Sequence, residues 1–219
     1  MHCQDLKELF MIQNNKKILG LILAGGLSRR MGNKNKFLKK INNNIIIDLI
    51  ISRAEKQVSY LILNTNDKIP YLSKFKLKEI PDLIKGYHGP LVGILSGMEW
   101  ARKQKEKIDY LATFSCDAPF FPEDLIQKLL KEITDQNLDI VIPKYKNQKH
   151  PVFGLWSLNL IDSLREYILE EKMKKIDTWI FKNNYKIIDF KNKKYDPFFN
   201  INTPEDLEKA NSISLKFNI

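Results

Sequence analysis

The feature that most constrains the fold is a regular alternation of short apolar runs and helix-patterned segments between residues 18 and 142. The first run, Ile18–Ala24, is apolar throughout and short, which is typical of a strand buried on both faces of a parallel sheet. Strands that alternate with helices form βαβ units, whose right-handed crossovers make the strands parallel. We therefore expect an α/β fold with a mostly parallel sheet between layers of helices.

The same pattern predicts the individual elements of this first part. Strands are expected at residues 18–24, 60–63, 77–80, 110–115 and 139–142. Helices are expected at residues 46–58, from Pro90 onward, and at residues 125–133, where apolar residues recur every three or four positions.

After residue 142 the alternation is lost. We expect a strand–turn–strand excursion at residues 144–156, helices near residues 158–171 and 174–183, and a strand pair near residues 185–201. The last helix has a clear start, because Thr203 is a favoured N-cap residue and Pro204 is favoured at the first helical position. The sequence therefore predicts one domain with a C-terminal elaboration.

The net charge of +10 over 219 residues gives little information about partners. Lysines occur in every region and alternate with acids along most helices, whereas a nucleic-acid-binding protein more often gathers its charge into one stripe. No nucleic acid is therefore expected as a partner. No apolar run reaches the length of about 18 residues that a membrane span needs, so we expect a cytoplasmic chain without membrane contact.

The strongest signal for chemistry is a glycine-rich loop directly after the first strand. Residues 23–32 are LAGGLSRRMG, and Lys36 follows four positions later. Glycines allow backbone N–H groups to approach phosphate oxygens, and Arg30 and Lys36 supply positive charge for a triphosphate. Two of only five arginines, Arg29 and Arg30, lie in this loop, beside thirty-one lysines in the chain. The loop predicts triphosphate binding, although its spacing is not that of a GxxxxGK[ST] P-loop.

Asp117 is the second signal, because it lies just beyond the carboxyl end of the strand expected at residues 110–115. In an open α/β sheet a carboxylate there faces the same crevice as the glycine-rich loop. Mg²⁺ favours one or two carboxylates together with phosphate oxygens, so Asp117 is predicted as its ligand. The alternative is that Asp117 only ends the strand and bonds the turn before Pro119.

Five further polar residues are candidates for contacts with substrates. Asn64 and Asp82 follow strands and are predicted to contact the base or ribose, although Asn and Asp also favour ordinary turns. His150, Asn200 and Asn202 are predicted to line the far side of the cleft. For His150, an ordinary hydrogen-bonded structural role is the competing interpretation.

Five motifs together resemble the molybdenum cofactor guanylyltransferase (MobA) family. They are LAGGLSRRMG with Lys36, GPLVGI, CDAPF, HPVFG and NINTPEDL, in this order from about Ile18 to Leu207. The resemblance implies a single-domain, Rossmann-like, three-layer nucleotidyltransferase fold. It also implies transfer of GMP from GTP to molybdopterin with Mg²⁺, and release of pyrophosphate. Molybdenum-insertion proteins and apo-molybdoenzymes, or the chaperones of these enzymes, are the protein partners that it implies.

The resemblance also implies roles for single residues. The nucleotide would be held by Leu23, Ala24, Gly25, Lys36, Asn64 and Asp82, and Asp117 would bind both GTP and Mg²⁺. We predict Arg30, Lys36 and Asp117 as the catalytic group, which neutralises charge as a molybdopterin phosphate attacks the α-phosphorus of GTP. No protein nucleophile is needed, and Cys116 is expected to be a small buried apolar residue.

On this basis the chain has three parts: an N-terminal extension at residues 1–17, a nucleotidyltransferase domain at residues 18–212 and a tail at residues 213–219. Residues 18–142 form the nucleotide-binding half of the domain, and residues 143–212 form the cofactor-side elaboration. Three alternatives stay open at this point. They are a molybdopterin cytidylyltransferase or another sugar- or alcohol-phosphate nucleotidyltransferase of the same fold, an adaptor that binds nucleotide or molybdopterin without turnover, and a basic RNA- or DNA-binding protein.

Overall fold

The computed structural model describes residues 16–25, 36–85, 89–170, 175–191 and 194–217. Most of the glycine-rich loop, including Arg30, lies outside these residues. So do residues 1–15, which make up most of the predicted N-terminal extension.

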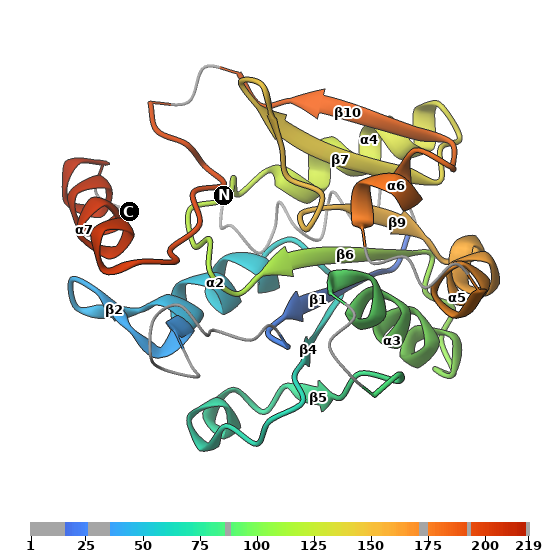
Figure 1. The fold of residues 1–219 in the computed structure, drawn as a ribbon, viewed down its shortest axis with the longest axis horizontal. Coiled ribbons are helices and arrows are strands. Elements are labelled where there is room, and N and C mark those ends of the chain that lie inside the picture. Colours follow the sequence, from blue (N-terminus) through green and yellow to red (C-terminus); the bar gives the residue numbers. More distant parts are fainter. Residues whose placement is uncertain (1–15, 26–35, 86–88, 171–174, 192–193, 218–219) are drawn as a thin grey trace.

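An eight-stranded sheet forms the centre of the described chain (Figure 1). Its strands are β1 (Ile18–Leu23), β4 (Tyr60–Asn64), β5 (Lys78–Ile80), β6 (Tyr110–Ser115), β7 (Ile140–Tyr145), β8 (Gln148–Lys149), β9 (Leu155–Ser157) and β10 (Tyr185–Asp189). The order is β10-β7-β9-β6-β1-β4-β5, with β8 paired to β7 beside this path. β1 pairs in parallel with β4 and β6, β4 with β5, and β10 with β7, so the mostly parallel sheet is confirmed.

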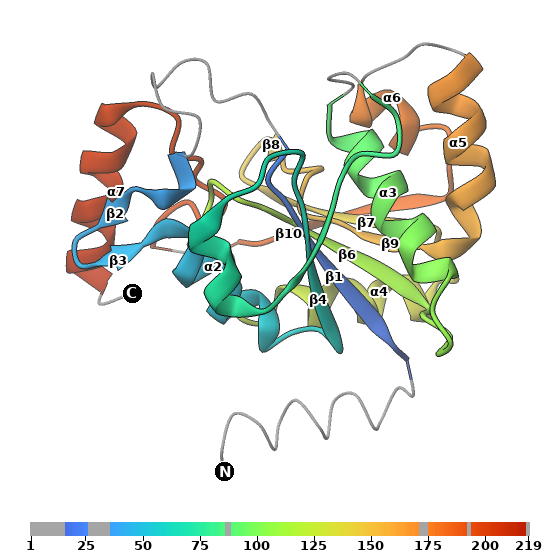
Figure 2. The same cartoon turned by 90° about the horizontal axis from the view of Figure 1, so that it is seen from below.

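Helices cover both faces of the sheet and give the expected three layers (Figure 1 and Figure 2). α2 (Ile46–Glu55) and α4 (Leu125–Asp135) bury their apolar residues in one core. α3 (Pro90–Arg102), α5 (Ile161–Glu170) and α6 (Ile176–Ile180) bury theirs in a second core. β1 contributes Ile18 and Ile22 to the first core and Leu19 and Leu21 to the second. This two-sided burial explains why the first apolar run contains no polar residue.

Further elements complete the described chain. They are the 3₁₀ helices η2 (Lys36–Leu38), η3 (Pro70–Phe75) and η4 (Leu158–Leu160), the small hairpin of β2 (Lys40–Ile41) and β3 (Asn44–Ile45), and the last helix α7 (Pro204–Phe217). α7 begins as predicted, because Thr203 Oγ1 accepts a hydrogen bond from the backbone N–H of Asp206 at 3.1 Å. Asp206 Oδ2 in turn accepts from the N–H groups of Asn202 and Thr203 at 2.9 and 3.0 Å. This reciprocal cap fixes the segment that enters α7.

The C-terminal elaboration differs from the expectation in one strand. The strand pair near residues 185–201 was wrong, because β10 is followed by bends and turns with no strand in residues 194–201. Pro197 offers no N–H for a strand ladder, and Asp196 Oδ1 accepts a hydrogen bond from the N–H of Phe198 at 2.9 Å. Such side-chain bonds to the local backbone favour a turn over a strand.

One boundary and one connection also differ in detail. α2 ends at Glu55, three residues before the predicted end, and Gln57 Nε2 donates to the carbonyl oxygens of Arg53 and Pro122. The excursion after residue 143 is a β7–β8 hairpin followed by β9, which enters the sheet antiparallel between β7 and β6.

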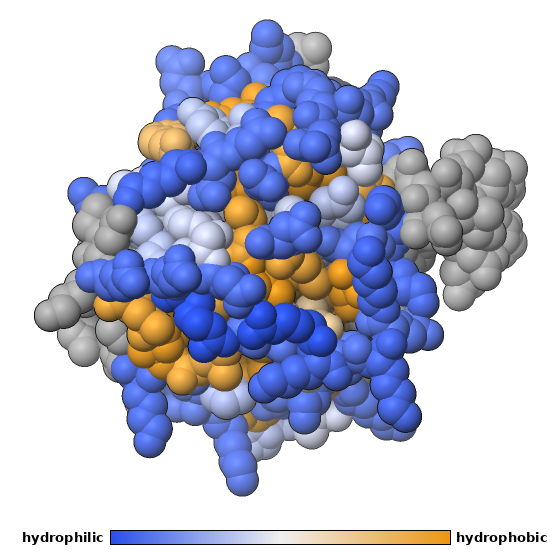
Figure 3. All heavy atoms as spheres, turned by 90° about the vertical axis from the view of Figure 1, so that its right-hand side faces the viewer, coloured by the Kyte–Doolittle hydropathy of each residue, from blue (hydrophilic) through white to orange (hydrophobic). Residues whose placement is uncertain are grey.

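The amino ends of β1 and β6 lie on the face that Figure 3 turns toward the viewer. Hydrophilic residues cover much of this face, and apolar residues form patches near its centre and at its lower left. Within the described ranges, none of the helices combines the length and the apolar character needed to cross a membrane.

Candidate active site

The strand order reverses at β1, and this reversal locates the site. After β1 the chain forms β4 and β5 on one side of it and then crosses to β6 on the other side. In the register of the sheet, Leu23 at the end of β1 is level with both Asn64 and Ser115, the last residues of β4 and β6. Ligands of open α/β sheets bind beyond the carboxyl ends of strands at such a reversal.

One polar cluster lies beyond β6, and we call it the lysine–aspartate cluster (Lys36, Ser115, Asp117 and Asn202). Lys36 Nζ lies 2.5 Å from Asp117 Oδ2 and 2.6 Å from Asn202 Oδ1. Ser115 Oγ donates to Asp117 Oδ1 at 2.5 Å. The side chains of Lys36 and Asp117 are each 15% exposed, so the ion pair is largely withdrawn from water but still open to a ligand.

Three segments that are distant in sequence bring this cluster together. Lys36 begins η2, and its neighbour Phe37 is buried in the first core and anchors that turn. The N–H of Ile201 donates to the carbonyl oxygen of Asp117 at 2.9 Å, which ties the segment before α7 to the end of β6. The cap of α7 then fixes Asn202, whose side chain meets Lys36.

A second polar cluster lies beyond β4 and β5, and we call it the amide–aspartate cluster (Asn64, Asn66 and Asp82). Asn64 Nδ2 donates to Asp82 Oδ1 at 2.9 Å, and Asn66 Nδ2 donates to Asp82 Oδ2 at 2.8 Å. Asn66 Oδ1 also accepts a hydrogen bond from the backbone N–H of Asp82 at 2.9 Å. Both oxygens of the Asp82 carboxylate are therefore held by amide groups.

The chain from Leu23 to Gly25 passes between the two clusters. The N–H of Ala24 donates to the carbonyl oxygen of Asn64 at 2.9 Å, which extends the pairing of β1 with β4 by one residue. A Cβ on Gly25 would lie 3.4 Å from Asn64 Oδ1 and 3.7 Å from Asp82 Oδ2, so Gly25 directly faces the amide–aspartate cluster. The structure thus brings Leu23, Ala24 and Gly25 beside Asn64 and Asp82, as a shared nucleotide site requires.

The spacing of the strands sets the distance between the clusters. Asn64 and Ser115 lie two strands apart at the same level, which corresponds to roughly 10 Å between their backbones. Asp82 follows β5, a further strand away, so its backbone lies on the order of 14 Å from that of Asp117. A ligand that contacts both clusters must therefore extend across the ends of β4, β1 and β6.

Asp117 fits Mg²⁺ as a single carboxylate ligand. The described residues contain no group of three or more His, Cys, Asp or Glu side chains that would hold a metal ion by themselves. Asp82 is too far away to share an ion with Asp117. Mg²⁺ keeps several water or phosphate ligands and is often held by one or two carboxylates, so one carboxylate beside a predicted triphosphate site matches this ion.

The residues predicted for the far side of the cleft lie in different environments. His150 is 7% exposed, and its ring stacks on that of Phe198 with a centroid distance of 4.7 Å. Burial lowers the pKa of His150, against a smaller opposing effect of the Asp196 charge. Its Nε2 atom is buried without a hydrogen-bond partner among the described residues. Asn200 is exposed, whereas Asn202 belongs to the lysine–aspartate cluster through its contact with Lys36.

Cys116 has the character expected from the sequence. It is buried at 8% exposure, and burial raises the pKa of its thiol to about 12, with the neighbouring Asp117 charge adding to this effect. A reactive cysteine needs a lowered thiol pKa. Cys116 is therefore a buried apolar residue, and this prediction is confirmed.

A surface cavity of about 1000 Å³ lies between the β7–β8 hairpin, residues 194–199 and α7. Its lining includes Tyr145, Tyr195 and Phe199, together with lysines of α7. None of the described residues predicted for the site lines it.

Sequence reasoning missed one residue of each cluster. Ser115 and Asn66 each lie two positions from a predicted site residue, and this spacing returns a side chain to the same side of an extended chain. Gly93 was missed as well: a Cβ there would lie 2.5 Å from Asn64 Oδ1, so only glycine allows α3 to pack against Asn64. The period-two spacing was a usable signal, whereas the close approach of α3 is visible only in the fold.

Comparison with known proteins gives the same result for family and fold. Residues 20–183 match the family model described as MobA-like NTP transferase domain. A molybdenum cofactor guanylyltransferase of Rhodopseudomonas palustris (strain BisB5) is 34% identical over 196 residues, which cover 90% of this chain and 93% of that protein. Another of Mesorhizobium japonicum is 34% identical over 198 residues, with coverages of 89% and 95%.

Two solved structures extend the comparison. Molybdopterin-guanine dinucleotide biosynthesis protein A from Archaeoglobus fulgidus has a TM-score of 0.74 at 25% identity, and the match covers 90% of this chain and 99% of that chain. A CMP:2-keto-3-deoxy-manno-octonic acid synthetase solved with CTP has a TM-score of 0.69 at 15% identity over 92% of this chain and 100% of that chain, a likeness of fold alone. The predicted nucleotidyltransferase fold is confirmed, and this chain is a nucleotidyltransferase that belongs to the MobA-like NTP transferase family.

Proposed function

We propose that this chain transfers GMP from GTP to molybdopterin, which forms the guanine dinucleotide form of the cofactor and releases pyrophosphate. The observation that carries this proposal is the Lys36–Asp117 pair at the strand-order reversal, in a chain whose relatives at 34% identity are named molybdenum cofactor guanylyltransferase. A cation and a carboxylate in contact suit a triphosphate, because the first binds phosphate oxygens and the second binds the accompanying Mg²⁺.

The reaction needs orientation and charge neutralisation, but no covalent intermediate on the protein. A phosphate oxygen of molybdopterin attacks the α-phosphorus of GTP and forms a new P–O bond. The bond from the α-phosphorus to the bridging oxygen breaks, and pyrophosphate leaves with its electron pair. Lys36 neutralises the charge that develops on the phosphate oxygens, and we assign the same role to Arg30, in the loop outside the described residues.

Asp117 and Lys36 keep free capacity for these contacts. Within the described residues, each oxygen of Asp117 accepts one hydrogen bond, from Lys36 or from Ser115, which leaves a lone pair for a metal ion. An ammonium group has three donors, and in the same part of the chain Lys36 uses one on Asp117 and one on Asn202. Mg²⁺ on Asp117 would stabilise the negative charge of the leaving pyrophosphate.

The roles of the other predicted site residues follow if the triphosphate lies at Lys36 and Asp117. The nucleotide extends from the lysine–aspartate cluster along Leu23, Ala24 and Gly25 to Asn64 and Asp82, which contact its base or ribose. Molybdopterin lies on the side of His150, Asn200 and Asn202, because Asn202 contacts Lys36. The protein partners that deliver molybdenum or receive the cofactor, and the cytoplasmic location, stay predictions from the sequence.

A thermal shift experiment with the four nucleoside triphosphates and Mg²⁺ tests the choice of substrate. A ligand at 100 times its Kd adds about 2.7 kcal/mol to the free energy of unfolding, which corresponds to about 5–11 °C for a chain of this size. We expect GTP to give the largest shift. A larger shift with CTP would refute guanylyl transfer and leave the family unchanged. Binding of GTP without pyrophosphate release, when molybdopterin is present, would favour the adaptor.

A further inference from the structure

Asp82 makes more hydrogen bonds than a turn residue requires, and two of them are to the side chain of Asn66. Its amide oxygen accepts the backbone N–H of Asp82 at 2.9 Å, and its amide nitrogen donates to Asp82 Oδ2 at 2.8 Å. A single side chain therefore fixes both the backbone and the carboxylate of Asp82.

We propose that Asn66 is a positioning residue, which orients the Asp82 carboxylate for its contact with the nucleotide. This inference rests on the proposed function, because that function gives Asp82 its ligand. Asn66 itself is assigned no direct contact with the nucleotide.

The other contacts of these side chains support a dedicated role for Asn66. Asn64 is 2% exposed and donates to the carbonyl oxygen of Ile80 as well as to Asp82, so it also joins the ends of β4 and β5. Asn66 is exposed, and its side-chain hydrogen bonds within the described part of the chain are both to Asp82. An exposed amide that bonds only one carboxylate residue contributes to its orientation more than to the core.

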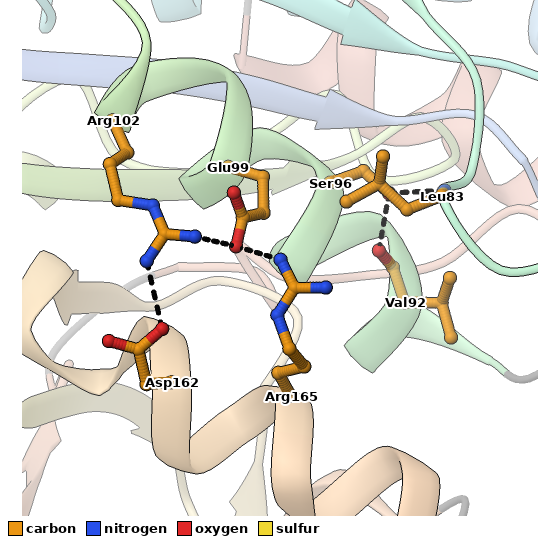
Figure 4. A network of polar contacts seen from close by, with 7 residues as sticks. All are labelled: Leu83, Val92, Ser96, Glu99, Arg102, Asp162 and Arg165. Atoms are coloured by element: carbon orange, nitrogen blue, oxygen red, sulfur yellow. Dashed lines mark hydrogen bonds and ion pairs between the residues drawn. The ribbon is translucent and has the colours of Figure 1, made fainter.

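The backbone on the other side of Asp82 is also fixed, as Figure 4 shows. The N–H of Leu83 donates to Ser96 Oγ at 2.9 Å, and Ser96 Oγ donates to the carbonyl oxygen of Val92 in α3 at 2.7 Å. Asn66 and Ser96 thus hold the successive N–H groups of residues 82 and 83. A carboxylate held in this way loses little freedom when a ligand binds, which favours affinity.

The variant Asn66→Ala tests the proposal directly. We expect about a tenfold rise in the Kd and KM for GTP, because the Asp82 carboxylate is then no longer held in place and must be ordered when the nucleotide binds. We expect kcat to stay within about twofold, because a contact that binds ground state and transition state equally changes KM alone. Asn184→Ala is the matched control: Asn184 is an exposed amide that donates to the Asn137 carbonyl oxygen at 3.2 Å, outside both clusters.

The variant Asn66→Asp separates positioning from a general structural role. It keeps an oxygen for the N–H of Asp82 but places a second carboxylate against Asp82 Oδ2. Two carboxylates in contact hold one proton more readily than an isolated one, and that proton restores the hydrogen bond. We expect the ratio of the Kd of this variant to the wild-type Kd to fall from about pH 8 to about pH 6. The nearest charged neighbours in sequence are Asp67, Lys68, Glu79 and Lys85. They are unchanged in both proteins, so the ratio removes their effects.

Kd is measured by titration and KM by pyrophosphate release, so binding is tested even without turnover. If Asp82→Ala weakens GTP binding but Asn66→Ala and Asn66→Asp do not, the positioning role is overturned and the proposed function stands. If none of the three variants changes the Kd, Asp82 does not contact the nucleotide, and the inference is overturned as well. Failure of the wild type to release pyrophosphate from GTP and molybdopterin contradicts the proposed function, whereas the Kd comparison still decides the role of Asn66.

Discussion

Replacing Asp117 by Asn removes one charge from the centre of the site and leaves its shape almost unchanged. The amide oxygen of Asn can accept the hydrogen bond from Lys36, and the amide nitrogen can donate to Ser115 Oγ, whose hydroxyl also accepts. The two contacts at 2.5 Å are therefore replaced by two contacts of similar geometry in which the side chain at position 117 is neutral. What disappears is the carboxylate that pairs with Lys36 and suits Mg²⁺.

The burial of the pair sets the cost in stability. Exposed ion pairs contribute about 0–1 kcal/mol, and breaking a fully buried pair costs about 3–5 kcal/mol. With both side chains 15% exposed, we expect Asp117→Asn to lower the free energy of unfolding by about 1–2 kcal/mol. This corresponds to a fall in Tm of about 2–8 °C. Turnover should fall by at least about 100-fold, because a neutral amide is a much poorer partner for Mg²⁺ than a carboxylate.

Asp109→Asn is the matched control for this experiment. The Asp109 side chain is also 15% exposed, and it accepts hydrogen bonds from Lys16 Nζ at 3.2 Å and from the N–H of Lys17 at 2.9 Å. It lies at the opposite end of β6, away from both clusters. The assay is pyrophosphate release against Mg²⁺ concentration, beside melting curves without ligand. Equal turnover of the two variants at low Mg²⁺ would refute the role of Asp117 as metal ligand.

Two further predictions concern packing and pH. Gly93→Ala should displace Asn64, because the new Cβ would lie 2.5 Å from Asn64 Oδ1 and 2.6 Å from Leu23 Cδ2. We expect the free energy of unfolding to fall by about 1–3 kcal/mol and the Kd for GTP to rise. An unchanged Kd in a titration would contradict this prediction. Burial lowers the pKa of His150, so the unfolded chain binds a proton more readily than the folded chain once the pH falls below the ordinary value of 6.5. The free energy of unfolding should therefore decrease with falling pH in this range. Melting curves of His150→Gln should show a smaller decrease than those of the wild type, and an equal decrease would contradict the reasoning.

The main strands and helices of the first half of the fold could be predicted from the sequence, because each of them is a simple local pattern. Ile18–Leu23 is apolar on both faces, and α4 has a clear apolar side, so burial alone determines what these segments form. β9 is different, because its three residues have no period of their own. It is held between β7 and β6 by pairing and by the Trp156 indole, whose Nε1 donates to Thr113 Oγ1 at 3.0 Å. Such a strand depends on contacts across the chain, which no local pattern records.

Prediction of the site from the sequence is limited in the same way, because its residues come from distant segments. Lys36 and Asp117 are predicted as partners of one triphosphate because each follows a strand end with a functional motif, and binding of the triphosphate stays a prediction. That they contact each other depends on the buried Phe37 and on the bond from Ile201 to Asp117, which connect remote segments. Asn202 was predicted only for the far side of the cleft, and the structure places its side chain on Lys36.

The Lys36–Asp117 ion pair determines how the charges of the site are balanced before and after a ligand binds. A lone ammonium or carboxylate at 15% exposure would lose much of its hydration without compensation. Together they compensate each other in the free chain, and Asn202 and Ser115 each hold one partner from the other side. Under the proposed function, the triphosphate attracts Lys36 while its cation attracts Asp117, so each charge exchanges one opposite partner for another. The site can therefore be preorganised for a highly charged ligand without leaving an uncompensated charge when the ligand is absent.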